Sequence, residues 1–458
     1  MNSALLSLLA VSALAAPLDA GAATELRYSG SLTRLSRDAE GQTVKRFSLY
    51  CLVTPQEGGG HRIGYLLDER GNGGWAWPER FGNLTFNERH EPSGAATVQL
   101  LQDHEGNLNL IPLPSPLFPY TDQLAANASW NAGNEAYQVQ RETTLNDRAC
   151  WQVEAATNFG RRKLLWIEKG TPLLVAAEAR VFMGQGEEFS LRMQLESQQA
   201  LDEAQLATVR KPFEILLKLQ SDLQRGENAR DPELDDTQLA KARDVLQPLE
   251  QAAEDTPFSR LASVISRDVK LQLQRSDEVV QLAKKFTGQP APEFQVPGLE
   301  KKQAAFGSGD LLGKITVLHF WEYQAEPLVE PYGQIGYLDY LHSRRRKLGV
   351  QIVGVAVDPR LAAADTATAA TRSISRLKSF MNVGYPITVD SGEILGKFGD
   401  PRRLGAKLPL WVVIDPEGKV VHYSVGFFKI NPDEGLRELD DVLVRLIQEQ
   451  RAKEKGGE

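Results

Sequence analysis

Cys51 and Cys150 are the only cysteines in a chain of 458 residues, and they are its candidates for thiol chemistry. A dithiol reaction needs one thiolate as nucleophile and a second sulfur that resolves the mixed disulfide. The even count also permits one structural disulfide, which would close a loop of about 100 residues and contribute at most ~4–5 kcal/mol. Cys51 shares a strand face with apolar residues, whereas Cys150 alternates with Gln152 and Glu154. The pattern therefore leaves both a bridge and two free thiols open.

Other kinds of catalytic or binding chemistry have little support in the sequence. The six histidines are scattered, and the glycine-rich stretches 58–60 and 71–74 lack the strand–helix context of a phosphate loop. Glu322 and Glu326 are close enough in sequence for acid/base work, but solvated surface groups are the simpler interpretation. We therefore expect neither a metal nor a cofactor. The net charge of −8 disfavours a nucleic-acid binder, which would present a basic face to phosphates.

The first residues have the pattern of an export signal. Residues 4–16 form a short, uncharged run of Ala, Leu, Val and Ser, and small-residue sites come directly after it. The run is too short to span a bilayer. We expect a signal peptide over residues 1–22, no transmembrane anchor after its removal, and an exported protein in the periplasm or outside the cell.

Residues 24–200 are expected to form an antiparallel β domain, because segments of alternating polarity recur between glycine-rich turns. The expected strands are 25–35, 46–54, 62–68, 97–101, 137–144, 150–156, 163–167, 173–182 and 188–196. Such a sheet can be an open barrel whose apolar face carries an acyl chain or peptide. It can equally be a packed domain without a ligand.

Residues 201–287 change to helical spacing and are expected to bridge the β domain to the C-terminal part of the chain. Asp202 and Gln205 have the spacing of a capping box at the start of the first helix. Pro212 should bend or shorten that helix. Asp236 is expected to open a second helix, and apolar residues from Phe258 onward predict a third.

Residues 288–452 are expected to form an α/β domain, with residues 453–458 as a disordered tail. Two short apolar runs, 315–321 and 350–357, are typical of buried parallel strands, and the segment between them predicts a helix. The expected elements after these are a helix near 371–381, strands 410–414 and 419–425 joined by a type I turn at 415–418, and a helix over 433–450.

This order of elements resembles the thioredoxin fold, and the sequence resembles exported thioredoxin-like thiol-disulfide reductases and the AhpC/TSA (redoxin) family. The residues that carry the resemblance lie in order at 291–294, 311–321, 349–358, 385–390 and 408–418. The resemblance is confined to residues 288–452. We therefore expect a multidomain protein with an antiparallel β domain, a helical bridge and a thioredoxin-like domain.

The resemblance also locates the family's active site, and this chain departs from it there. Residues 320–328 lie where the family carries Phe-Trp-x-x-x-Cys-x-Pro-Cys, but Ala325 and Leu328 occupy the two cysteine positions. Glu326 lies between them and Pro327 keeps the proline of the motif. Neither Ala nor Leu can act as a thiolate, so the resemblance implies a degenerate active site without catalytic residues.

In the family this loop faces a cis-proline loop, which corresponds here to Leu408 and Pro409. The resemblance implies a groove that could bind another protein or an extended polypeptide by backbone pairing. Its candidate residues are Tyr323, Gln324, Leu408 and Pro409. An alternative is that Pro409 serves only the entrance of the hairpin.

The sequence leaves three functions as hypotheses. The first, which we favour, is a redox-inactive binding or assembly module. Under this hypothesis the protein is not an enzyme. The second is a thiol-disulfide oxidoreductase or antioxidant-type protein that uses Cys51 and Cys150. The third is a carrier of an apolar ligand in the β domain.

Overall fold

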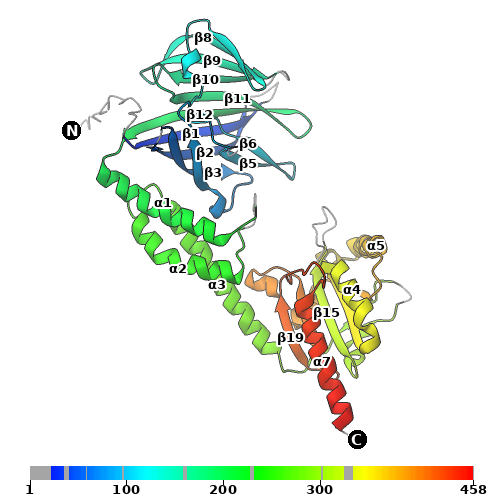
Figure 1. Ribbon diagram of the computed structural model, residues 1–458. Coiled ribbons are helices and arrows are strands. Elements are labelled where there is room, and N and C mark those ends of the chain that lie inside the picture. The colour runs from blue at the N-terminus through cyan, green and yellow to red at the C-terminus, as the bar shows by residue number, and fades with distance from the viewer. Residues whose placement is uncertain are drawn as a thin grey trace, which may run out of the picture. The chain divides into compact units, whose positions relative to one another are not determined.

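A computed structural model describes residues 22–35, 41–57, 59–94, 97–157, 162–226, 232–300, 303–323 and 334–456. The expected signal peptide lies outside the described residues except for its last position. The chain divides into two compact units, residues 1–270 and 271–458, and the boundary falls inside helix α3 (Ser259–Phe286) (Figure 1). No helix in the described part is long and apolar enough to cross a membrane.

The first unit contains a ten-stranded antiparallel sheet with the order β4-β3-β2-β1-β12-β11-β10-β9-β8-β7, and a separate β5–β6 hairpin. The strands are β1 (Thr24–Arg34), β2 (Gln42–Pro55), β3 (His61–Gly71), β4 (Phe81–Phe86), β5 (Gln99–His104), β6 (Asn107–Pro112), β7 (Ser129–Ala132), β8 (Glu135–Leu145), β9 (Arg148–Thr157), β10 (Arg162–Glu168), β11 (Leu174–Met183) and β12 (Glu187–Ala200). The predicted antiparallel β domain is confirmed. The sequence analysis missed β4, β6 and β7, which are short.

One face of this sheet packs against the chain's own segment between β4 and β8. Leu100, Ile111 and Phe118 from that segment belong to the same buried cluster as Leu49 of β2 and Val153 of β9. The apolar face is therefore covered by side chains of the same chain, as in a packed domain.

The opposite face of β2 meets the helices. The Tyr50 ring lies edge-on to Phe258 with ring centroids 5.5 Å apart, and Phe258 stacks on Phe213 of α1 (Glu203–Leu223) at 5.4 Å. Trp77 in the turn before β4 donates a hydrogen bond to Asp268 of α3 at 2.8 Å. Helices α1, α2 (Asp236–Ala253) and the first part of α3 thus belong to the same compact unit as the sheet, and the expected helical segment after the β domain is present.

Both α1 and α2 begin with a capping box, and the start of α2 differs from the expected position by one residue. Asp202 and Gln205 form the predicted capping box. The box of α2 uses Asp235 with Gln238, one residue before the expected start at Asp236. Pro212 does not end α1, which continues through 21 residues with Pro212 itself buried. Packing on the sheet outweighs the loss of one backbone hydrogen bond.

The second unit is built on a five-stranded sheet with the order β17-β16-β15-β18-β19, in which β15, β16 and β17 are parallel and β18 and β19 are antiparallel. Its elements are β13 (Gln295–Val296), β14 (Phe306–Gly307), β15 (Ile315–Glu322), α4 (Ile335–Arg345), β16 (Val350–Val357), η6 (Pro359–Ala362), α5 (Ala364–Phe380), β17 (Ile387–Asp390), α6 (Glu393–Lys397), η7 (Pro401–Leu404), β18 (Leu410–Ile414), β19 (Val420–Val425) and α7 (Arg437–Gly456). This arrangement confirms the predicted thioredoxin-like fold.

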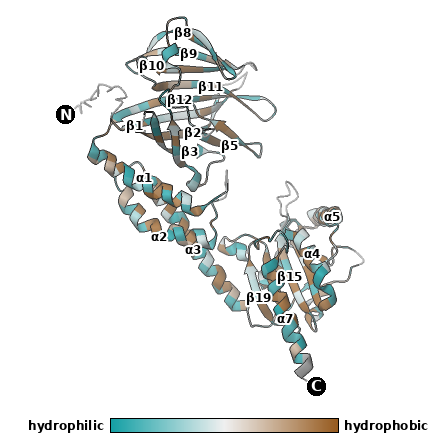
Figure 2. Ribbon diagram, viewed as in Figure 1, coloured by the Kyte–Doolittle hydropathy of each residue, from teal (hydrophilic) through white to brown (hydrophobic). Residues whose placement is uncertain are grey.

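Each face of this sheet has its own core. Leu338 of α4, Leu377 of α5 and Leu443 of α7 share a buried cluster with β15 residues of one face. Leu395 of α6 belongs to the cluster on the other face, and Phe286 at the end of α3 packs against that cluster. The helices carry hydrophobic and hydrophilic residues along their length (Figure 2), as amphipathic cover for a buried sheet requires.

The structure of the β18–β19 hairpin and of the last helix can be compared with the predicted type I turn at 415–418 and the predicted tail at 453–458. The turn between β18 and β19 is closed by a hydrogen bond from Gly418 N to Asp415 O, and Gly418 has a positive φ of 83°. The final helix α7 continues to Gly456, so the part of the expected tail that is described is helical.

Candidate functional site

The described part of the candidate site begins where β15 ends. Tyr323 is 5% exposed, and its backbone N–H donates to Val357 O at 3.1 Å. Its hydroxyl lies 2.6 Å from Ser373 Oγ of α5. Strand pairing and this hydroxyl contact together fix the chain at the point where it enters the segment 324–333.

Two turns with the same sequence, Asp-Pro-Arg, lie at this edge of the sheet. Asp358 precedes η6 and accepts hydrogen bonds from the Arg360 backbone N–H at 2.9 Å and from the Arg360 guanidinium at 2.6 Å. Asp400 precedes η7 and does the same with Arg402, at 3.0 Å and 2.8 Å. In each turn the aspartate caps the short helix and the proline provides a fixed φ at its first position.

Each arginine also reaches the end of β15. The Arg360 guanidinium lies over the Tyr323 ring, 6.0 Å from its centroid. Arg402 forms an ion pair with Glu322 at 3.3 Å. Partial burial raises the pKa of Asp400, but the hydrogen bonds and charge of Arg402 outweigh it and hold that pKa below its ordinary value. We expected Glu322 to be a solvated surface carboxylate. It is exposed, and it is paired with Arg402.

The Leu408–Pro409 peptide bond is cis, as the family resemblance implied. The Pro409 carbonyl accepts a hydrogen bond from Gly426 N at 2.8 Å. Leu408 is 7% exposed and belongs to the buried cluster that contains α6, whereas Tyr323 belongs to the cluster on the opposite face of the sheet. Tyr323, Leu408 and Pro409 of the candidate groove thus have buried side chains.

The remaining candidates of this site lie outside the described residues. They are Gln324 of the expected groove and the four degenerate positions Ala325, Glu326, Pro327 and Leu328. Next to the hydrogen-bonded Gly426, Phe427 is 55% exposed, and sequence reasoning did not single it out.

The two histidines near the expected site are packed. His319 is fully buried in β15, and its ring stacks on Trp411 with centroids 4.0 Å apart. His422 lies on β19, where burial, followed by the charge of Arg445, lowers its pKa.

Cys51 and Cys150 are both free, fully buried thiols in the first unit. Cys51 faces the apolar core of the sheet, as expected. Cys150 is also buried, although it alternates with polar residues on β9. Burial raises the pKa of the Cys51 thiol well above its ordinary value. Burial, followed by the charge of Glu168, raises the pKa of Cys150 to about 11.

Among the described residues, the fold gathers one set of potential metal ligands that the sequence did not reveal. His104 and Glu105 lie at the β5–β6 turn, and their ligand atoms lie within 4.8 Å of each other and of the Glu187 carboxylate. Glu187 is already paired with Arg34 and lies 3.0 Å from His104 Nε2. The ion pair with Arg34 thus already occupies one of the three candidate ligands.

Comparisons with known proteins find similarity in the C-terminal part of the chain. Residues 287–423 match the model of the AhpC/TSA family. Prx1a of Plasmodium yoelii is 21% identical over 38% of this chain and 95% of its own, with a TM-score of 0.28. A thiol:disulfide interchange protein from Chlorobium tepidum TLS is 19% identical over 35% of this chain and 96% of its own, with a TM-score of 0.27.

A thiol:disulfide interchange protein from Bacteroides sp. is 17% identical over 35% of this chain and 90% of its own, with a TM-score of 0.25. No curated protein sequence matches this chain. The family match, together with the strand order and the cis proline, leads to one conclusion. The C-terminal region of this chain is a thioredoxin-like redoxin domain.

Proposed function

We propose that the redoxin domain is a redox-inactive module that binds another protein or an extended polypeptide. The observation that carries the proposal is that residues 151–458 contain no cysteine, and Ala325 and Leu328 stand where the family carries its two. Without a cysteine thiol in the domain, no mixed disulfide can form on it.

The two cysteines of the first unit are poorly suited to replace the family's two active-site cysteines. A thiol reacts as its thiolate, and the raised pKa values of Cys51 and Cys150 keep both protonated near neutral pH. Both side chains are also 0% exposed, so a substrate disulfide cannot reach them without local unfolding. These observations disfavour an oxidoreductase that uses this pair.

The surface around the cis proline supports the binding role. Leu408 and Pro409 are buried, so a bound chain would meet mainly the backbone there. Phe427, at 55% exposure, adds a large apolar side chain directly after the residue that hydrogen-bonds to Pro409. Exposed aromatic side chains are enriched where proteins bind each other.

The redox part of the proposal is tested by a disulfide-reduction assay with a dithiol donor and an active thioredoxin as reference. We expect no turnover by the wild-type chain. Turnover that persists after Cys51→Ser and Cys150→Ser would contradict the proposal, because no sulfur nucleophile would then remain.

The binding part is tested by capture of partners from the exported fraction on the full-length chain. The variant Phe427→Ser should lose the specific partners. The matched control is Phe380→Ser, since Phe380 is 83% exposed at the far end of α5 from the Asp358 turn. Equal capture by the two variants would show that this surface does not dock the partner.

We further propose that the protein is exported, on the pattern of residues 4–16. N-terminal sequencing of the protein from the extracytoplasmic fraction should begin near Ala23. Recovery of the protein solely from the cytoplasm, with an intact start, would contradict export.

A further inference from the structure

Three side chains from two hairpins of the first unit bring a nitrogen and two carboxylates to one place. His104 ends β5 and Glu105 begins the turn that follows, whereas Glu187 begins β12. One ligand atom of each residue lies within 4.8 Å of the other two. Two protein atoms bound to the same tetrahedral metal ion, at about 2.1 Å each, lie about 3.4 Å apart. Small side-chain movements would therefore let all three atoms reach one ion.

Two of these ligand atoms are buried without hydrogen-bond partners. His104 Nε2 and Glu187 Oε2 lie 3.0 Å apart, yet neither forms a hydrogen bond with the other or with any other described residue. The His104 side chain is only 11% exposed, and Phe189 lies edge-on to its ring with centroids 5.2 Å apart. An imidazole N–H aimed at the carboxylate would make a strong hydrogen bond. Buried polar atoms that meet without one require another partner, and a shared cation provides it.

Arg34 holds Glu187 by the oxygen that does not meet His104. Its guanidinium pairs with Oε1 of Glu187, whereas Oε2 is the oxygen near the imidazole. The pair offsets one of the two carboxylate charges of the cluster, and the carboxylate of Glu105 leaves one net negative charge. This excess favours a cation.

The backbone of both turns fits a ligand at this place. Gly184 lies in the β11–β12 turn, and a Cβ there would lie 3.1 Å from His104 Nε2 and 3.3 Å from Glu105 Oε2. Glu105 has a φ of 53°, a left-handed conformation that Gly, Asn and Asp adopt more readily than Glu. A glutamate at this position costs stability, and a cation that uses its carboxylate accounts for the choice.

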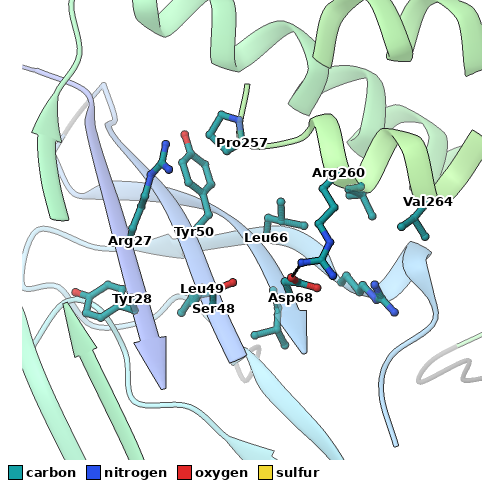
Figure 3. A pocket seen from close by; sticks show the side chains of 13 residues that line it. Arg27, Tyr28, Ser48, Leu49, Tyr50, Leu66, Asp68, Pro257, Arg260 and Val264 are labelled. Atoms are coloured by element: carbon teal, nitrogen blue, oxygen red, sulfur yellow. Dashed lines mark hydrogen bonds and ion pairs between the residues drawn. The ribbon is translucent and has the colours of Figure 1, made fainter. Parts of the chain in front are cut away.

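The polar groups of the cavity beside α3 have partners instead. That cavity, of about 320 Å³, lies between β1–β3 and the start of α3, with Tyr50 and Arg80 among its walls. Arg260 pairs there with Asp68, as the dashed line in Figure 3 shows, and Arg80 donates to a backbone carbonyl. Burial, followed by the charge of Glu25 and a hydrogen bond with it, raises the pKa of Tyr50. The cluster around His104 is therefore the stronger indication of a bound ligand.

We propose that His104, Glu105 and Glu187 bind one divalent transition-metal ion such as Zn²⁺. Zn²⁺ accepts imidazole nitrogen together with carboxylate oxygen, whereas Mg²⁺ and Ca²⁺ prefer oxygen ligands alone. The ion ties the β5–β6 hairpin, which is not part of the ten-stranded sheet, to the β11–β12 hairpin of that sheet. Leu100 and Ile111 of the tied hairpin belong to the core that covers the sheet, so the ion stabilises this cover. The site is independent of the role proposed for the redoxin domain.

Calorimetric titration of the untagged, metal-free full chain with ZnCl₂ tests the site. We expect one Zn²⁺ per chain and at least tenfold weaker binding of Mg²⁺. His104→Ala and Glu187→Gln should each weaken Zn²⁺ binding at least tenfold, since loss of a direct ligand costs no less than loss of an outer contact. The matched controls are His90→Asn, in the turn after β4, and Glu188→Gln, which follows Glu187 and pairs with Arg180. Both controls should bind Zn²⁺ as the wild type does.

The proposal is overturned if Zn²⁺ binding does not saturate at one ion per chain or if Mg²⁺ binds as tightly. It is also overturned if either ligand variant binds Zn²⁺ like the wild type, or if His90→Asn alone abolishes binding. Anomalous scattering at the zinc edge from wild-type crystals grown with ZnCl₂ gives a readout that does not depend on the folding of any variant. A peak between His104 and Glu187 is expected, and a peak confined to other residues would overturn the assignment.

Discussion

Arg402 pairs with Glu322 at 3.3 Å and thereby ties the last residues of β15 to the turn that precedes the cis Leu408–Pro409 bond. Arg360 has the corresponding relation to Tyr323 through its position over the ring. The two Asp-Pro-Arg turns thus hold both residues that lead into the segment 324–333.

The contribution of these turns to stability should depend on burial. Asp358 has a side chain only 2% exposed and accepts both the backbone and the guanidinium of Arg360. We expect Asp358→Ala to lower the free energy of unfolding by about 1–2 kcal/mol, through loss of the cap and its hydrogen bonds. Glu322→Gln breaks an exposed ion pair and should cost about 0.5 kcal/mol or less. Urea denaturation measures both, and equal losses would contradict this ranking.

The pair His61 and His90 should make the first unit less stable in mild acid. Burial lowers the pKa of His61, and burial together with the charge of His61 lowers that of His90. A histidine in the unfolded chain has a pKa of about 6.5. Below that pH the unfolded chain therefore binds protons that the folded chain does not, and stability falls as the pH drops from about 7 toward 5.

Replacement of one histidine of this pair should reduce that dependence. The variant His90→Asn suits the position, because His90 has a φ of 61° and Asn tolerates this conformation. Calorimetric melting between pH 5 and 8 should show a smaller loss of stability at low pH in the variant. Melting curves that stay parallel to the wild type across this range would show that the pair is not responsible.

The thiols should be free but unreactive in the native protein. With both thiols fully buried and with raised pKa values, Ellman's reagent at pH 8 should label neither Cys51 nor Cys150 at an appreciable rate. In denaturant without reductant, two thiols per chain should react. A titre of zero in denaturant would instead identify a disulfide and disagree with the free cysteines of the structure.

Restoring the missing sulfurs should restore chemistry if the frame is intact. The double substitution Ala325→Cys with Leu328→Cys places cysteines at the family's two positions around Pro327. We expect measurable reduction of a disulfide substrate by a dithiol donor, in a background with Cys51 and Cys150 changed to serine. The single substitution Leu328→Cys lacks the attacking thiol and is the control. Inactivity of the double variant would indicate that the loop no longer has the family's geometry.

Many secondary-structure elements of both units could be predicted, because the sequence patterns that specify them are local. The apolar run of β16 was predicted with its observed bounds, since a strand buried on both faces needs consecutive apolar residues. The capping box at Asp202 was likewise readable from two side chains three residues apart. The short strands β4, β6 and β7 were missed, because a few residues carry too little alternation to be distinguished from loop.

The sequence by itself determined that the redoxin domain has no sulfur nucleophile, since this depends only on which residues are present. It could not show that Cys150 is buried or that side chains of the same chain cover the apolar face of the large sheet. It also could not show that Tyr50 and Arg80 line one cavity with α3. These features join residues that lie tens to hundreds of positions apart in the chain. Such contacts are decided by how sheet and helices pack, and no local pattern of residues encodes them.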